Sequence, residues 1–167
     1  MRNIPLILLA SIIASIEGGL ADARCSHSVG ESGRLVLMNE NVLDPHTHLV
    51  WMRCSLGTHW MPRSGCVGEV QTKSLQDAKR IADGIGGDWR VPTADELFSL
   101  VNQSCGSPAI DTTAFPDMRP DPEGLPYWTT TPLGLAGLTV YIDFSEGIYD
   151  GHSSGFPLPV RLVRSAR

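Results

Sequence analysis

DWRVPTADELFSLV, residues 88–101, contains the clearest local signals in the chain. Pro92 keeps the residue before it extended, because its ring disfavours the helical conformation there. Thr93 is followed three residues later by Glu96, and this spacing is a capping box, in which each side chain accepts a hydrogen bond from the backbone of the other residue. The buried side of the predicted helix consists of Leu97, Leu100 and Val101. The stretch therefore predicts a short extended piece and then a helix that begins after Thr93 and is closed at 105–106.

A second helix is predicted upstream of this stretch. It begins at Ser74, with Asp77 at the capping-box position, and its apolar stripe consists of Leu75, Ala78, Ala82 and Ile85. Short strands are expected where β-prone or alternating residues cluster, at 35–38, 49–52, 127–131, 138–144 and 160–164. Segments 55–73 and 107–126 are expected to be long irregular loops. This order predicts an α+β domain with two helices packed on an antiparallel sheet.

Composition limits both the fold and the partners. The 167 residues suffice for one domain, and the 42% of hydrophobic residues can fill its core. The formal net charge is −5 and no run of Lys or Arg occurs, so no nucleic-acid partner is expected. Arg161 and Arg164 face opposite sides of the predicted strand and form no patch, so weak or absent heparin binding is expected.

The first 23 residues have the pattern of a signal peptide. Arg2 gives a positive start, residues 4–16 are almost wholly apolar, and the sequence ADA at 21–23 is a small-x-small cleavage pattern. The apolar run is shorter than the ~20 residues that a membrane span needs, and no second run follows. We therefore expect residues 1–23 to be removed and residues 24–167 to form a single periplasmic or secreted domain that does not span the membrane.

Four cysteines follow the predicted cleavage site: Cys25, Cys54, Cys66 and Cys105. An even number of cysteines in an exported chain predicts two disulfides, and four cysteines allow three pairings. No CxxC spacing occurs, so neither a thioredoxin-like redox site nor a zinc ribbon is expected.

Several segments occur together in the order typical of one bacterial family. They are VLDPHTHLVWMRCSLG at 42–57, DWRVPTADELFSLV at 88–101, YWTTT at 127–131 and VRLVR at 160–164. Together they resemble the Lcl C-terminal domain family, and the resemblance covers about residues 33–165. It implies a C-type-lectin-like fold. It also implies a disulfide between Cys54 and Cys66, since family members often carry cysteines at both places, with Cys25 and Cys105 as the second pair.

The resemblance also bears on function. The family's namesake domain sits on a collagen-like adhesin that binds sulfated polysaccharides, but this chain has no Gly-x-y repeat, so adhesion through a multivalent stalk does not carry over. We expect an exported binding module that recognises a glycan, a surface polymer or an envelope protein. Because binding residues usually lie in loops, the binding surface is expected at 107–126 and 145–157, with Tyr127, Tyr149 and His152 as candidate ligand-binding residues.

Two other functions are weighed against binding. One is an accessory or structural subunit of a cell-envelope or pilus assembly, without sugar affinity. The other is a formylglycine-generating type of enzyme, because WRVPTADEL at 89–97 is similar to the WRLPTEAEW element of those enzymes, which share the lectin-like fold. No copper-binding cysteine pair of that type is visible, and no GxSxG motif occurs. The chain is therefore not expected to be an enzyme.

Two places in the sequence offer potential metal ligands. His46 and His48 lie two residues apart near Asp44, a spacing that puts both imidazoles on one face of a strand, but the family usually has D..TGL here and the histidines look incidental. Loop carboxylates that offer oxygen ligands to Ca²⁺ are Asp111, Asp117, Asp121, Asp143, Glu146 and Asp150. The EPN, QPD and WND motifs of sugar-binding C-type lectins are absent, so neither Ca²⁺ nor another cofactor is expected.

The aromatic residues of the shared segments have two interpretations. Trp51, Trp89 and Trp128 are expected to pack in the core, since each ring buries ~150–250 Å², and stacking on a sugar is the alternative. Arg90 is expected to form an ion pair with a nearby carboxylate from Asp88, Asp95 or Glu96, rather than to bind an anionic ligand.

Overall fold

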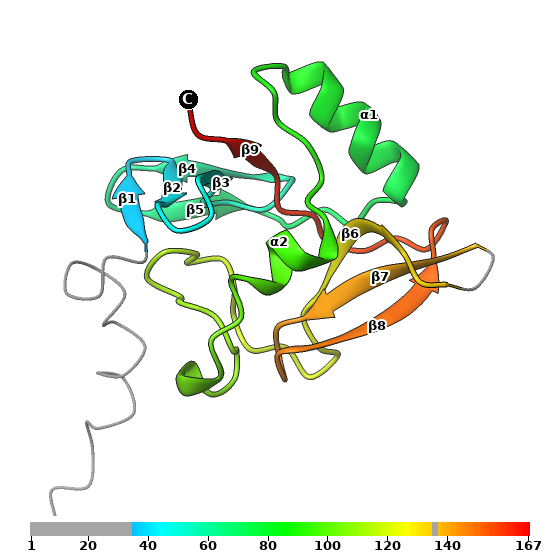
Figure 1. Ribbon diagram of the computed structural model, residues 1–167. Helices are drawn as coiled ribbons and strands as arrows, with labels where there is room; N and C mark the ends of the chain where they lie inside the picture. Colours follow the sequence, from blue (N-terminus) through cyan, green and yellow to red (C-terminus); the bar gives the residue numbers. More distant parts are fainter. Residues whose placement is uncertain (1–34, 135–136) are drawn as a thin grey trace, which may run out of the picture.

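The computed structural model describes residues 35–134 and 137–167. These residues form two α-helices and three antiparallel sheets (Figure 1). The predicted α+β class with two helices is confirmed, although the strands are divided among several sheets rather than gathered in one. The predicted signal peptide, residues 1–23, lies outside the described residues, and so does Cys25 of the predicted Cys25–Cys105 pair.

The first sheet joins the two ends of the domain. Its order is β1-β2-β3-β9, formed by Val36–Met38, Asn41–Asp44, Leu49–Met52 and Val163–Ser165. The strand register aligns one row of side chains across all four strands: Leu37, Val42, Trp51 and Val163. This row faces the core. The neighbouring row consists of Val36, Leu43, Val50 and Arg164. Because side chains alternate along a strand, this second row lies on the opposite, outer face of the sheet.

The second sheet has the order β6-β7-β8, formed by Pro126–Pro132, Leu138–Asp143 and Ile148–Ser153. Strand β6 lies where β-prone residues predicted it, and strand β7 where alternating residues predicted it. Strand β8 falls within 145–157, which was expected to be a loop; its sequence IYDGHS begins with two β-prone residues and continues with Asp and Gly, which are depleted in strands. It pairs with β7 along its whole length, so hydrogen bonds to a neighbouring strand decide its conformation.

Helix α1 spans Leu75–Ile85 and begins where its cap predicted. The Ser74 hydroxyl accepts a hydrogen bond from the backbone N–H of Asp77 at 3.2 Å. Leu75, Ala78 and Ala82 are buried, as the stripe predicted, but Ile85 at the end of the helix is 47% exposed.

Helix α2 spans only Ala94–Phe98. Its capping box is present as predicted: Thr93 accepts from the backbone of Glu96, and Glu96 accepts from the backbone of Thr93. The prediction that the helix continues to 105–106 is wrong, since the chain leaves the helix after Phe98 and forms a 3-10 turn at Gln103–Cys105. Leu97 and Leu100 are buried nonetheless, so core packing accounts for the apolar pattern beyond the helix end.

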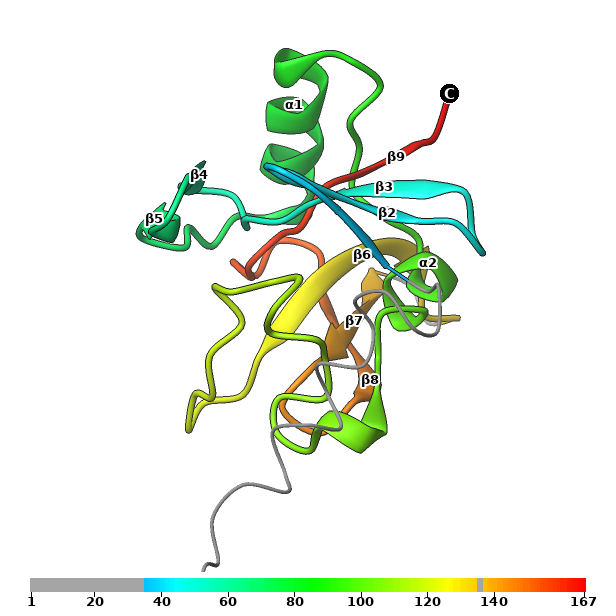
Figure 2. The ribbon, with the colours of Figure 1, turned by 90° about the vertical axis from the view of Figure 1, so that its left-hand side faces the viewer.

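The predicted irregular loop 55–73 contains a third, two-stranded sheet, which corrects that prediction. Strands β4 (Thr58–Met61) and β5 (Gly65–Gly68) form a hairpin that projects away from the other sheets (Figure 2). A disulfide joins Cys66 of β5 to Cys54, which confirms that predicted pair. At the base of the hairpin, Gly57 has a φ of 93° and lies against the backbone of 69–71, where a side chain would not fit.

Two clusters of buried side chains form the core. One lies between the inner face of the first sheet, α2 and the β6-β7-β8 sheet, and the other lies between α1, β6 and the segment that leads into β9. Trp51 and Trp128 are fully buried, as predicted. Trp89 is only half-buried at the edge of the second cluster, so its predicted place in the core is wrong. None of the helices in the described ranges is long and apolar enough to cross a membrane.

Candidate functional site

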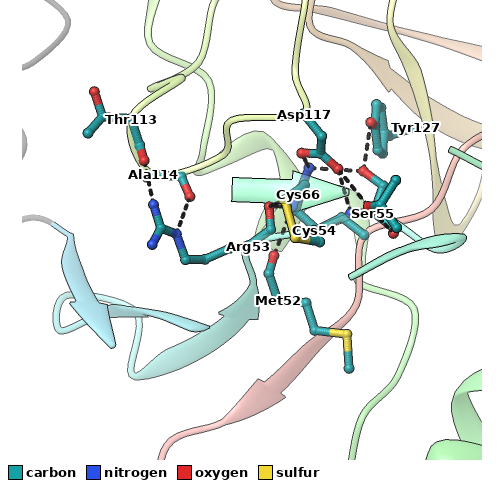
Figure 3. A network of polar contacts seen from close by, with 11 residues as sticks. Met52, Arg53, Cys54, Ser55, Cys66, Thr113, Ala114, Asp117 and Tyr127 are labelled. Atoms are coloured by element: carbon teal, nitrogen blue, oxygen red, sulfur yellow. Dashed lines mark hydrogen bonds and ion pairs between the residues drawn. A yellow bond between two sulfur atoms is a disulfide. The ribbon is translucent and has the colours of Figure 1, made fainter. Parts of the chain in front are cut away.

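Arg161 is fully buried and organises the polar centre of the molecule. Its Nη2 lies 2.6 Å from Oδ1 of Asp117 and 3.0 Å from Oγ of Ser55. Its Nη1 donates to two backbone carbonyls at the end of β3. The hydroxyls of Ser55 and Tyr127 are 2.8 Å apart, so the network extends to β6 (Figure 3). These contacts join the end of β3 to the segments around 117 and 161.

The charge of Asp117 is held inside this network. Desolvation by burial acts to raise its pKa, but the charge of Arg161 and hydrogen bonds from Ser55 and Arg161 lower it, and the pKa lies below its ordinary value of 3.8. The backbone N–H of Ser55 donates to Oδ2 at 2.6 Å. Burial also raises the pKa of Tyr127, which therefore stays a neutral phenol. The network positions the chain just before the β4–β5 hairpin and presents no free group to solvent.

Arg53 anchors the β4–β5 hairpin through hydrogen bonds to other segments and a stack on Trp60. Its side chain donates to the carbonyls of Ala114, Thr113 and Asn39 at 3.0, 2.8 and 3.0 Å. These three hydrogen bonds fix the orientation of the guanidinium. Its central carbon lies 3.7 Å from the centre of the Trp60 ring. The ring nitrogen of Trp60 donates to Oδ1 of Asn39 at 3.1 Å. Trp60, which is half-buried, is thus held on one face by Arg53 and along one edge by Asn39.

A groove of about 480 Å³ lies between the hairpin, the end of α1 and the outer face of the first sheet. Its lining includes two tryptophans from distant parts of the sequence, Trp60 of β4 and Trp89, which follows α1. Trp89 packs against Arg164, whose guanidinium carbon lies 4.9 Å from the ring centre. Ligand pockets typically have this size and combine apolar walls with a few polar groups.

Polar groups of both charges line the same groove. They are Glu40, Asn41, Thr58, His59 and Arg164, and the apolar floor is formed by Met52, Leu56 and Ile85. Within the described residues, neither Glu40 nor Arg164 forms an ion pair. The Nε atom of Arg164 is buried, so the terminal nitrogens of Arg164 and the carboxylate of Glu40 are the groups that a ligand could contact. Two aromatic rings with donors and acceptors around them suit a ligand with flat apolar faces and many hydroxyls.

The three sequence-predicted ligand-binding residues lie apart from this groove. Tyr127 is 1% exposed and belongs to the buried network described above. Tyr149 is 64% exposed on β8, where its ring packs edge-on against Phe98. His152 is half-buried on the same strand and stacks on Phe156 with ring centres 4.0 Å apart. The structure therefore places Tyr149 and His152 on β8 and not together with the buried Tyr127.

The residues considered for metal binding have structural roles or lie apart. His46 and His48 are exposed in the β2–β3 turn, and Asp44 accepts a hydrogen bond from the backbone of His46 at 2.9 Å. Several of the loop carboxylates accept backbone N–H groups that stabilise turns, as Asp121 and Asp143 do. No group of three potential metal ligands is found within 35–134 and 137–167.

Arg90 forms the structural ion pair predicted for it. Both of its terminal nitrogens contact Glu96, at 2.7 and 2.6 Å, and Glu96 is the capping residue of α2. The hydrogen bond from Arg90 is the main reason that the pKa of Glu96 lies below its ordinary value of 4.5. This pair fixes the segment that carries Trp89 to the start of α2.

Sequence reasoning missed the groove because its residues come from five separated segments. Trp60 lies outside the segments quoted above, and its ring becomes a surface platform only when the β4–β5 hairpin packs it on Arg53. One signal was available: THWM at 58–61, between two cysteines, contains an aromatic residue in a segment too polar and glycine-rich to need one for a core.

The family model of the Lcl C-terminal domain matches residues 40–164. This match covers the groove, the buried network and both helices, which confirms the family suggested by the sequence segments. A search of curated protein sequences finds no match.

Proposed function

The chain belongs to the Lcl C-terminal domain family, and we propose that it is an exported binding module that recognises a glycan through the groove between Trp60 and Trp89. The single observation that carries this proposal is that two half-buried tryptophans from different elements line one groove together with hydrogen-bonding side chains. A pyranose ring has apolar C–H faces that pack on an aromatic ring, while its hydroxyls require donors and acceptors at the rim.

The rigidity of the groove supports binding rather than incidental exposure. Trp60 is held by Arg53 and Asn39, the hairpin is closed by the Cys54–Cys66 disulfide, and Trp89 packs on Arg164. A site that is already ordered loses less conformational entropy when its ligand binds. We also propose a C-type-lectin-like relationship for the fold, which is supported by the family match and by the α+β architecture with two helices.

We also propose that the protein is periplasmic or secreted and acts by binding, without catalysis. The signal-peptide pattern at 1–23 supports export, and a disulfide between Cys54 and Cys66 suits an oxidising compartment. The absence of a nucleophile motif in the sequence, together with a groove lined by stacking and hydrogen-bonding residues, favours binding over the formylglycine-generating type of enzyme.

A glycan array with the purified protein and matched variants tests the proposed binding site. We expect Trp60→Ala and Trp89→Ala each to reduce binding of the recognised glycan about tenfold or more, because each removes a stacking surface near the centre of the site. Tyr149→Ala is the control, since this exposed aromatic residue lies outside the groove lining. Equal loss in all three variants, or loss only in Tyr149→Ala, would contradict the groove as the site.

The stability of Trp89→Ala provides a check on the same experiment. A tryptophan in the core would cost ~3–5 kcal/mol on truncation. Since Trp89 is half-buried, we expect a loss of about 1–2 kcal/mol, small enough for the variant to remain folded during binding measurements.

A second surface favours the alternative function, a subunit of a cell-envelope or pilus assembly. Phe98, Ile148 and Tyr149 are 43%, 48% and 64% exposed, and β8 is an edge of its sheet. An exposed sheet edge with neighbouring apolar side chains is a common place for another chain to bind. Photo-crosslinking from position 149 in the cell envelope tests this alternative, with position 46 in the exposed β2–β3 turn as the control.

A further inference from the structure

We propose that the ligand is an internal stretch of a linear polysaccharide, which continues from the groove into a second pocket on the same face of the first sheet. The inference rests on the proposed glycan binding and adds the class of glycan: an extended polymer read along its chain rather than at its end. It is carried by the geometry of two pockets that share one arginine.

The second pocket has a volume of about 290 Å³. Its lining consists of Met38, Leu43, Val50, Arg164, Ser165, Ala166 and Arg167. Met38, Leu43 and Val50, three of its four apolar residues, come from the strands β1, β2 and β3, so the floor of the pocket is the outer face of the sheet itself. Such a floor can support the C–H face of a sugar ring, and the residues of β9 provide polar groups beside it.

Strand register shows that the pockets are adjacent. Asn41 and Met52 are paired across β2 and β3 and line the groove, whereas Leu43 and Val50 are paired two residues further along and line the second pocket. Residues two apart on a strand share a face and are separated by about 7 Å. The two pairs are therefore successive steps along the same sheet face, and a ligand that lies on the first pair reaches the second without a change of direction.

Arg164 stands at the junction and lines both pockets. It is paired with Val50 across β3 and β9, and its guanidinium packs over the ring of Trp89. It forms no ion pair with any described residue, so its terminal N–H groups are available to the ligand. A guanidinium presents several donors in a fixed plane, which suits the hydroxyl and ring oxygens on either side of a glycosidic linkage.

Binding of oligosaccharides of increasing length tests the inference. The probes are ladders of one to six β-1,4-linked glucose, N-acetylglucosamine and mannose units, together with the long polysaccharides of each, measured by calorimetry with the full protein. We expect affinity to rise by tenfold or more between the shortest member that binds and the member long enough to occupy both pockets, and then to reach a plateau. The long polysaccharide should bind as well as the plateau members, because its interior is recognised.

A matched pair of variants separates the second pocket from the rest of the sheet. Met38 and Val36 are both exposed on β1, at 39% and 45%, but only Met38 lines the second pocket. We expect Met38→Ala to weaken binding of the long members about fivefold and to leave the shortest members unchanged, while Val36→Ala changes neither.

The outcomes distinguish the two proposals. Trp60-dependent binding that is equally tight for a single sugar and for a hexamer overturns the polymer inference and leaves glycan binding in place. Equal effects of Met38→Ala and Val36→Ala on the binding of the long members also overturn the polymer inference and leave glycan binding in place. If no ladder or polysaccharide binds, or if binding does not depend on Trp60, both the glycan-binding proposal and the polymer inference are overturned.

Discussion

Two arginines three positions apart in the sequence have opposite roles. Arg161 is fully buried and ion-paired with Asp117, whereas Arg164 is half-buried on the outer sheet face and lines the groove. The two side chains do lie on different sides, but the strand predicted at 160–164 is only Val163–Ser165, so Arg161 precedes β9 and strand alternation is not the reason. The sequence pattern did not reveal that the Arg161 guanidinium would be buried among Ser55 and Tyr127, which come from other parts of the chain.

Removal of Arg161 tests the importance of the buried pair. We expect Arg161→Met to reduce the free energy of unfolding by about 3–5 kcal/mol, because it leaves the carboxylate of Asp117 buried without its partner. Urea denaturation measures the loss. The double variant Arg161→Met/Asp117→Asn, which also removes the buried charge, should be less destabilised than the single variant. A single variant within 1 kcal/mol of the wild type would show that the pair contributes little, as exposed pairs do.

The ion pair also predicts a dependence of stability on acid. The pKa of Asp117 is lower in the folded protein than its ordinary value of 3.8, so the unfolded chain takes up the proton first as the pH falls. The stability supplied by the charged form is fully present above 3.8 and is lost as the pH falls through the lower, folded value. Urea midpoints from about pH 7 to about pH 2 should therefore fall more steeply for the wild type than for Asp117→Asn. Parallel curves for the two proteins would contradict the assignment.

At the scale of elements, the local signals and the long-range contacts determine different parts of the fold. Helices α1 and α2 begin at the residues predicted from Ser74 and Thr93, because a cap needs only groups three positions apart. The β4–β5 hairpin depends on contacts beyond its own sequence: the disulfide to Cys54 and the stack of Trp60 on Arg53. Its own side chains are mostly exposed or half-buried, so it adds little to either core cluster.

We therefore expect the Cys54–Cys66 disulfide to contribute both to the stability of the protein and to glycan binding. We expect Cys54→Ser/Cys66→Ser to lose roughly 3 kcal/mol of unfolding free energy, the chain-entropy value for a loop of this length, and to bind glycan at least tenfold more weakly because Trp60 loses its position. Denaturation and array binding measure the two effects. Full glycan binding by the double variant would show that Arg53 alone suffices to hold Trp60 in place.

At the scale of the whole molecule, charge argues against a strongly basic binding surface. The net charge is −5, Arg161 is neutralised by Asp117, Arg90 by Glu96 and Arg167 by Asp88. Arg164 and Arg167 do line one pocket together, which is closer than the sequence suggested. A single pocket with two guanidinium groups does not produce the long-range positive field that concentrates a polyanion.

We therefore keep the prediction of weak heparin binding. The protein should elute from heparin resin at pH 7 below physiological salt, about 0.15 M. Arg164→Gln should change the elution little, because local hydrogen bonding rather than field strength is its expected contribution. Retention well above that salt concentration, lost in Arg164→Gln/Arg167→Gln, would mean that the second pocket selects anionic sugars and that the charge argument is wrong.

The sequence by itself determined what depends on near neighbours or on the pattern of the whole family. The caps of both helices, the strand at 49–52 and most of the strand at 138–144, the burial of Trp51 and Trp128, and the family with its Cys54–Cys66 disulfide were predicted. An ion pair of Arg90 was predicted too, with Glu96 as one of three possible partners. Each of these follows from residues a few positions apart or from segments shared along the chain.

Only the tertiary structure decided where a binding surface lies. The groove needs β4, the end of α1 and β9 to meet, and these elements are separated by up to about a hundred residues in the sequence. How exposed Trp60 and Trp89 are depends on the side chains that pack against their rings. These are Arg53 and Arg164, and no local sequence pattern specifies the two contacts. Tyr127, which was expected to bind a ligand, is buried instead by a long-range contact: its hydroxyl forms a hydrogen bond with Ser55, 72 residues earlier in the chain.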